Sequence, residues 1–373
     1  MHRTDASMLT EPTMIEPWNL TVVQPAVKPV FKGDAPLRRD ALRENLERAC
    51  QHVRTAQRYS RSKVVVFPEF FLHGFQPGRS NADWIDASLR LDGPELAQLG
   101  AAAKAAGCYV AGMIYEVLDD FPGRFWNTAF ILDPQGRVAL IYRKLYAMTG
   151  KTRPGDVYDE YVRRYGGPHA LFPVLRTPYG NLGCLVCYDI NFPEVARCLA
   201  LNGAEVLLHI SSEGRSGYHL PDGGWELARR VRAYENHAYL AMSNCGPNID
   251  GEAPEDVSHG HSQVIHFEGK VLNMAESAGE TLITAEIDIE ALRRRRSRAS
   301  LNFLAELSTG IHAPIYAAAR HWPLNGWAQT PGTGVAENRQ VEAEVIADLT
   351  RRGVLMAPTT LEAQGVGRLS QQE

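Results

Sequence analysis

Residues 183–194 read GCLVCYDINFPE, which combines the end of an apolar strand, a tight turn and the start of a helix. The apolar run ends at Cys187, and Pro193 suits the first turn of a helix because its missing N–H needs no partner there. A cysteine at such a junction lies near unpaired backbone N–H groups, which favour a thiolate and can bind a developing oxyanion. Position alone is equally compatible with a buried packing cysteine.

The sequence around this stretch alternates short β-branched or aliphatic runs with longer amphipathic ones, a pattern that predicts an α/β fold. We predict strands at residues 20–24, 63–67, 109–114, 126–131, 138–142, 181–187, 206–210, 239–244, 262–266 and 281–287, and helices at 40–60, 93–106, 193–202 and 225–236. No helix separates the strands between residues 109 and 142, and residues 133–136 (DPQG) are typical of a hairpin turn. The sheets should therefore be mixed.

The composition is that of a soluble globular protein, with 45% hydrophobic and 22% charged residues in a chain of 373. A net charge of −4 gives no field that would attract nucleic acid or a membrane surface. No apolar run has the length of a membrane span or a signal peptide, so we expect a cytoplasmic protein with free thiols. We expect a flexible tail at residues 1–15 and one domain at 16–290. Residues 291–373, which include a basic run at 293–296, should form a C-terminal extension that makes oligomer contacts and is partly disordered.

Two further charged residues follow predicted strands. Glu69 comes directly after the apolar run VVVFP, where burial would raise its pKa and suit it to proton transfer. Lys144 ends another strand in the string YRKLY, and beside a buried glutamate it would supply a fixed positive charge. Each could instead be an ordinary solvated charge at a strand end.

Three strings, FPEFFLHGF at Glu69, YRK at Lys144 and CYDINFPE at Cys187, together resemble the motifs of the nitrilase superfamily of carbon–nitrogen hydrolases. The resemblance extends over about residues 19–290. It implies a four-layer αββα sandwich with two mixed sheets, and assembly into a homodimer or a larger homo-oligomer.

The resemblance also implies roles for these residues. Glu69 would act as general base and then acid, Cys187 would form a thioester, and Lys144 would stabilise the oxyanion together with the backbone N–H of Tyr188. Many members carry a second glutamate between the lysine and the cysteine. Glu160 is the best positional match, with Asp156 or Asp159 as alternatives.

The expected activity is hydrolysis of a small amide or N-carbamoyl compound, with release of ammonia or an amine and without a cofactor. Members that act on nitriles tend to have Trp-Glu after the nucleophile, whereas this chain has Tyr188-Asp189. Nitrile hydrolysis by the same triad is the alternative within the family. A non-catalytic binding or regulatory protein on the same fold is the alternative of a different class.

Metal and redox sites have weak support in the sequence. Cys184 and Cys187 form a C-x-x-C, but residues three apart on a strand point to opposite faces. His259 and His261 have no evident third ligand nearby. We therefore expect no metal.

Overall fold

The computed structural model describes residues 14–76, 78–147, 152–214, 223–249, 260–319, 321–330 and 334–358, and these contain two six-stranded sheets. The first sheet has the order β12-β1-β2-β3-β4-β5, formed by Thr281–Ile287, Trp18–Gln24, Val64–Val66, Tyr109–Glu116, Trp126–Leu132 and Val138–Arg143. The second has the order β11-β10-β9-β8-β7-β6, formed by Val271–Met274, Gln263–Ile265, Tyr239–Ser243, Val206–Ile210, Gly180–Val186 and Val174–Thr177. Both sheets are mixed, as the sequence predicts.

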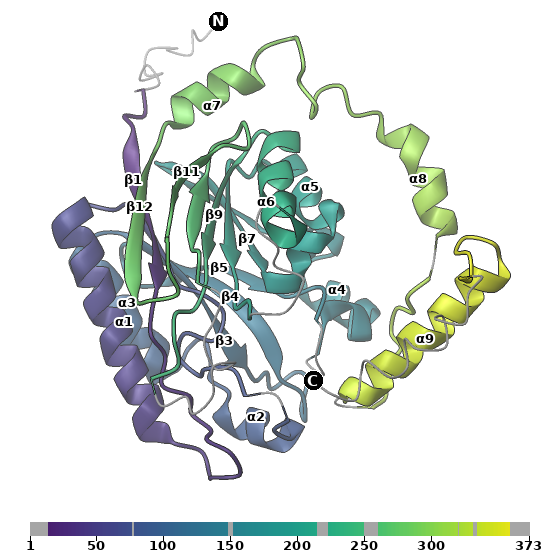
Figure 1. Ribbon diagram of the computed structural model, residues 1–373, viewed down its shortest axis with the longest axis horizontal. Helices are drawn as coiled ribbons and strands as arrows, with labels where there is room; N and C mark the ends of the chain where they lie inside the picture. The colour runs from purple at the N-terminus through teal and green to yellow at the C-terminus, as the bar shows by residue number, and fades with distance from the viewer. Residues whose placement is uncertain are drawn as a thin grey trace, which may run out of the picture.

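The two sheets pack face to face between two layers of helices (Figure 1). The helices are α1 (Arg39–Ser60), α2 (Asn81–Ala87), α3 (Pro94–Ala106), α4 (Tyr158–Tyr165), α5 (Pro193–Leu201), α6 (Gly224–Glu235), α7 (Ile289–Arg296), α8 (Thr309–Ala318) and α9 (Val335–Arg351). Single 3-10 turns are η1 (Pro154–Val157), η2 (Pro168–Leu171) and η3 (Cys187–Asn191). Helices α1 and α3 cover the first sheet, and α5 and α6 cover the second. The expected αββα sandwich is thereby confirmed.

The hydrophobic pattern explains the layers. The three valines of β2 are fully buried because their strand lies inside a sheet that is covered on both faces. Helix α1 buries Leu42, Leu46, Ala49 and Val53, which recur at helical spacing and form one apolar stripe against the sheet.

A meander of antiparallel strands, β3-β4-β5, forms one edge of the first sheet. The turn between β4 and β5 is the predicted hairpin, in which the Asp133 carboxylate accepts hydrogen bonds from the backbone N–H groups of Gln135 and Arg137. Helix α3 crosses this turn so closely that a Cβ added at Gly100 would lie 2.4 Å from the carbonyl oxygen of Gly136. Only glycine fits at this crossing.

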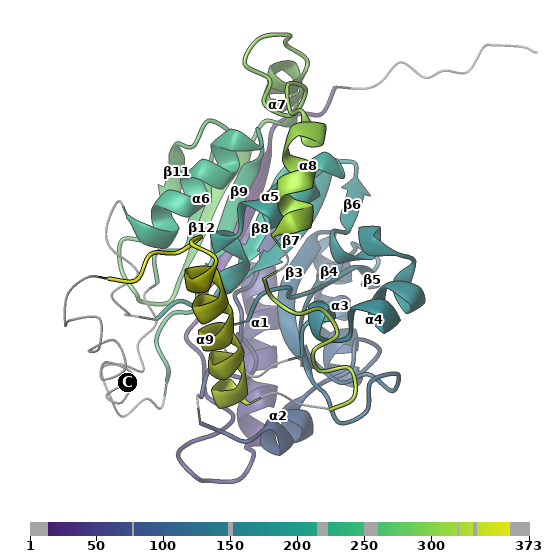
Figure 2. The same ribbon diagram turned by 90° about the vertical axis from the view of Figure 1, so that its right-hand side faces the viewer.

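The structure adds several short elements that the sequence pattern did not predict. Strands β6 and β11 and helices α2, α4 and α7 are each eight residues long or shorter, so each offers little periodicity. The C-terminal extension contains helices α8 and α9, which lie outside the four layers at the right of Figure 1 and therefore in front of them in Figure 2. The proposed division into tail, domain and extension stays a prediction, and residues 1–13 of the tail lie outside the described residues.

The basic run is attached to the body of the protein. On α7, Arg293 forms an ion pair with Glu205 at 2.8 Å, and Arg296 donates hydrogen bonds to the carbonyl oxygens of Ala204, Asn236 and His237. Arg293 remains partly exposed, with 42% of its side chain accessible, so the ion pair fixes one end of a surface residue. Arg293 and Arg296 join α7 to the start of β8 and to the end of α6.

Candidate active site

Glu69, Lys144 and Cys187 each follow a strand, and the ends of these three strands lie at the same end of the sandwich. Glu69 follows β2 and Lys144 follows β5 within the first sheet, and these strands run in the same direction because two antiparallel pairings separate β3 from β5. Cys187 directly follows β7 of the second sheet. The site is thus shared between the two sheets.

The side chains of the three residues meet. Lys144 Nζ lies 2.8 Å from Glu69 Oε1, and the Cys187 thiol shares a hydrogen bond with the Glu69 carboxylate. All three are buried, with exposed fractions of 1% for Glu69, 5% for Lys144 and 8% for Cys187. Asn127 Nδ2 donates a further hydrogen bond to Glu69 Oε1, and the Asn127 carbonyl accepts one from the backbone N–H of Lys144. Asn127 was not identified from the sequence, since nothing in its string WNTAF distinguishes it.

The backbone of Cys187 adopts a positive φ of 49°, an uncommon conformation for a residue with a side chain. His209, on β8, donates a hydrogen bond from Nε2 to the Cys187 carbonyl oxygen at 3.1 Å. Burial lowers the pKa of His209 to about 4, so its ring is neutral at pH 7. This neutral ring helps to hold the sharp turn at which the sulfur projects.

The protonation of the sulfur differs from the expectation. The pKa of Cys187 is raised to about 12, mainly by burial and also by the Glu69 charge, while the Lys144 charge lowers it only in part. The resting group is therefore a thiol that is hydrogen-bonded to Glu69, and the thiolate expected from its place beside a helix start is corrected. For Lys144, burial alone would lower the pKa, but Cys187, Glu69 and Asp189 raise it above its usual range. Lys144 therefore stays an ammonium.

Asp189 holds the turn after the cysteine. It is fully buried and accepts hydrogen bonds from the Tyr142 hydroxyl at 2.7 Å and from the backbone N–H groups of Tyr146 and Val186 at 2.9 and 3.0 Å. Burial raises the pKa of Asp189 to about 6. Its role is to tie the strand that carries Lys144 to the turn that carries Cys187.

Glu160 lies elsewhere and does not join this cluster. Its partly exposed carboxylate is bound by Arg163 and Arg164 on the same helix, α4, and these hydrogen bonds lower its pKa to about 2. Of the two alternatives, Asp159 is exposed, and Asp156 is buried in an ion pair with Arg153 at 2.8 Å. The positional match misled because α4 turns the Glu160 carboxylate toward its own arginines, Arg163 and Arg164.

Glu213 is a further buried carboxylate at the site, beside Glu69 and Asp189. It follows β8, is 2% exposed and acts on the pKa of Cys187 through its charge. The signal that identified Glu69, an acidic residue after an apolar strand, could have identified Glu213 after residues 206–210 as well.

Cys184 lies inside β7 and is fully buried, so burial raises its pKa above the usual range. The six cysteines are free thiols. Within the described segments no group of three or more potential ligand side chains could hold a metal ion, and His259 lies outside those segments. None of the helices described has the length and apolarity needed to cross a bilayer.

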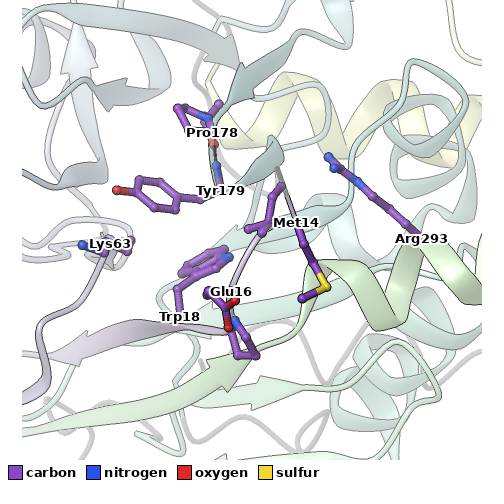
Figure 3. Close-up of a pocket in the computed structure, with 10 residues that line it drawn as sticks. Met14, Glu16, Trp18, Lys63, Pro178, Tyr179 and Arg293 are labelled. Atoms are coloured by element: carbon purple, nitrogen blue, oxygen red, sulfur yellow. Dashed lines mark hydrogen bonds between the residues drawn. The ribbon is translucent and has the colours of Figure 1, made fainter. Parts of the chain in front are cut away.

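A cavity of about 560 Å³ opens at the other end of the sandwich, around Trp18, Lys63 and Tyr179 (Figure 3). These residues lie where β1, β2 and β7 begin, whereas Glu69 and Cys187 lie where β2 and β7 end. The cavity is therefore separate from the triad.

Comparisons with known proteins agree with this geometry. Residues 20–297 match the carbon-nitrogen hydrolase family. The omega-amidase NIT2 of Xenopus tropicalis is 29% identical over 68% of this chain and 87% of its own length, and that of Bos taurus is 30% identical over the same shares. A hydrolase of Schizosaccharomyces pombe is 31% identical over 68% of this chain and 74% of its own.

Solved structures show the same fold. The carbon-nitrogen hydrolase from Helicobacter pylori G27 superposes with a TM-score of 0.63 at 23% identity, covering 80% of this chain and 98% of that one. Nit3 of Saccharomyces cerevisiae, a member of the nitrilase superfamily, gives a TM-score of 0.60 at 23% identity, covering 79% and 99%. Because the family match spans most of the sequence and contains all three strand-end residues, this chain belongs to the carbon-nitrogen hydrolase family.

Proposed function

We propose that this protein hydrolyses the carbon–nitrogen bond of a small linear amide through a thioester on Cys187. The observation that carries the proposal is the buried contact of the Glu69 carboxylate with both the Lys144 ammonium and the Cys187 thiol. A carboxylate that touches a thiol can take its proton, and a fixed ammonium beside them can stabilise negative charge.

In the first half-reaction, Glu69 takes the Cys187 proton while the sulfur bonds to the amide carbon. The carbonyl oxygen becomes an oxyanion, which faces the Lys144 ammonium and the backbone N–H of Tyr188. Glu69 then gives the proton to the nitrogen, the carbon–nitrogen bond breaks, and ammonia or an amine leaves. The product on the enzyme is a neutral thioester.

In the second half-reaction, Glu69 takes a proton from water as the water oxygen attacks the thioester carbon. The same oxyanion site stabilises the second tetrahedral intermediate. Collapse breaks the carbon–sulfur bond, and Glu69 returns the proton to sulfur. The acid is released, and the resting thiol is restored.

An amide or N-carbamoyl substrate is favoured over a nitrile by the Tyr188-Asp189 pair after the nucleophile and by the relatives named as omega-amidases. The test is ammonia or amine release across amides, N-carbamoyl compounds and nitriles, compared between wild type and Cys187→Ala, with mass-spectrometric detection of the acylated cysteine. Equal inertness of both proteins across the panel would favour the binding or regulatory function instead.

We also propose that the protein forms a homodimer or a larger homo-oligomer through α6. This helix exposes Leu227 (50%), Val231 (38%) and Tyr234 (49%) at helical spacing on one face, which would be buried against a second copy. Light scattering on wild type and on Val231→Glu tests this. A monomeric wild type would contradict it.

A further inference from the structure

An ion pair between Glu213 and Arg229 is buried beside the triad. Arg229 Nη1, on α6, donates to both carboxylate oxygens of Glu213 at 2.8 and 2.9 Å, and the Ser211 hydroxyl donates to Glu213 Oε1 at 2.7 Å. Neither charged side chain is more than 2% exposed. A pair as buried as this is costly unless its hydrogen bonds are satisfied, so its position needs a reason.

The guanidinium is held from its other side as well. When the Gln263 amide is oriented with its oxygen toward Arg229, that oxygen accepts hydrogen bonds from Nε and Nη2 at 3.3 and 3.2 Å. Gln263 belongs to β10, so this arrangement joins α6 and β10 to the end of β8. Three elements thereby fix the Glu213 carboxylate.

The segment that Glu213 holds in turn holds the peptide groups of Glu69. The Ser211 carbonyl oxygen accepts a hydrogen bond from the Glu69 N–H at 3.1 Å, and the Cys245 thiol donates to the Glu69 carbonyl oxygen at 3.0 Å. The backbone N–H groups of Glu213 and Cys245 both bind Asn244 Oδ1, at 2.8 and 3.0 Å. The backbone of Glu69 is therefore held at both ends from the second sheet.

This arrangement matters because the proton must pass between sheets. Glu69 belongs to the first sheet and Cys187 to the second, and proton transfer requires them to stay within hydrogen-bond reach. A displacement of about 1 Å at such a site can cost on the order of a hundredfold in rate.

We propose that Glu213, fixed by Arg229, is a positioning residue that holds Glu69 in register with the Cys187 sulfur through Ser211. The proposal rests on the proposed function of the same site. In this proposal Glu213, rather than Glu160, is the second glutamate at the active site. Its role is to position Glu69, and it takes no part in the chemical steps.

The charge of Glu213 provides an independent readout. The charges that act most on Cys187 are those of Glu69 and Glu213, which raise its pKa, and that of Lys144, which lowers it. Removal of the Glu213 charge should therefore lower the pKa of the thiol, and the pH midpoint of its alkylation should fall. This readout needs no substrate.

The matched control lies at the other end of the same strand. Glu205 directly precedes β8, is 5% exposed and forms a comparable two-bond pair with Arg293 at 2.8 and 3.0 Å. Glu205→Gln and Glu213→Gln each remove the charge of a buried carboxylate that is paired with an arginine, although the Arg293 side chain is 42% exposed. Only Glu213 is connected to Glu69.

For the experiment, kcat, KM and the pH profile of iodoacetamide alkylation at Cys187 are measured on the purified full-length variants. In Glu213→Gln we expect kcat to fall by about 10- to 100-fold with KM changed less than about threefold, and the alkylation midpoint to move to lower pH. Glu205→Gln should keep kcat within about twofold of wild type and should leave the pH midpoint of Cys187 alkylation unchanged.

Equal losses in the two variants, or a kcat for Glu213→Gln within about twofold of wild type, would overturn the proposal. If Glu213→Gln does not fold, Ser211→Ala decides, because it removes one hydrogen bond to Glu213 and should still lower kcat by about threefold or more. If wild type hydrolyses neither an amide nor an N-carbamoyl compound, the proposed function fails. An unmoved alkylation midpoint in Glu213→Gln would show separately that the Glu213 proposal fails too.

Discussion

Replacement of Lys144 by methionine tests the electrostatic core of the site. The change keeps most of the side-chain volume and removes an ammonium that lies 2.8 Å from Glu69 Oε1. At an effective dielectric constant of about 20, two unit charges at that distance attract by about 6 kcal/mol. A charge about 4 Å from a developing oxyanion contributes about 4 kcal/mol, which is roughly a thousandfold in rate.

We therefore expect Lys144→Met to lower kcat about a thousandfold or more in an ammonia-release assay with the best amide of the substrate panel. Lys104→Met is the control, because Lys104 is exposed on α3, far along the chain from the triad, and should keep wild-type turnover. A variant that retains more than about a tenth of wild-type kcat would refute the assigned role of Lys144.

The stability of Lys144→Met, relative to wild type, should depend on pH. Without the ammonium, the buried Glu69 carboxyl should bind its proton more tightly in the folded than in the unfolded chain. Such a group stabilises the fold at low pH, and this stability is lost as the pH rises through the folded pKa. The free energy of unfolding in urea should therefore fall below that of wild type by about 3–5 kcal/mol at pH 8 and by less at pH 5. An equal deficit at both pH values would contradict this.

Three further predictions concern Glu160, Cys187 and His73. Glu160→Gln should keep kcat within about twofold, since its carboxylate binds only arginines of its own helix among the contacts described; a loss of tenfold or more would return it to the site. Iodoacetamide should label Cys187 before Cys184 in peptide mapping, because Cys184 is enclosed within a strand; the reverse order would count against the site. Burial lowers the pKa of His73 to about 4. The free energy of unfolding should therefore drop by about 2 kcal/mol between pH 7.5 and pH 5, because the unfolded chain binds a proton at His73 and the folded chain does not. In urea titrations His73→Gln should show a correspondingly shallower pH dependence.

Local patterns were sufficient for the main strands and helices. The valines of β2, the apolar stripe of α1 and the DPQG turn each combine hydrophobic period with turn chemistry in a few consecutive residues. The short strands β6 and β11 and the helices α4 and α7 have too few residues to show a period, and contacts with the rest of the protein decide them.

Some residues of the site could be identified from the sequence, and others could not. Glu69, Lys144 and Cys187 could be identified because each stands directly after an apolar strand in a distinctive string. Asn127 and His209 lie within strands, where a polar residue has no local signature of function. Glu160 had the right place in the sequence but the wrong place in space, because a helix turns it toward Arg163 and Arg164.

The sequence by itself determined the αββα class, the three strand-end residues and their likeness to the carbon–nitrogen hydrolases, because these depend on residue type and order along the chain. Only the tertiary structure decided that burial and the Glu69 charge favour the thiol form of Cys187 and that Glu213, rather than Glu160, is buried beside the triad. Protonation depends on burial and on charges that distant segments bring within a few ångströms, and the order of residues does not specify those distances.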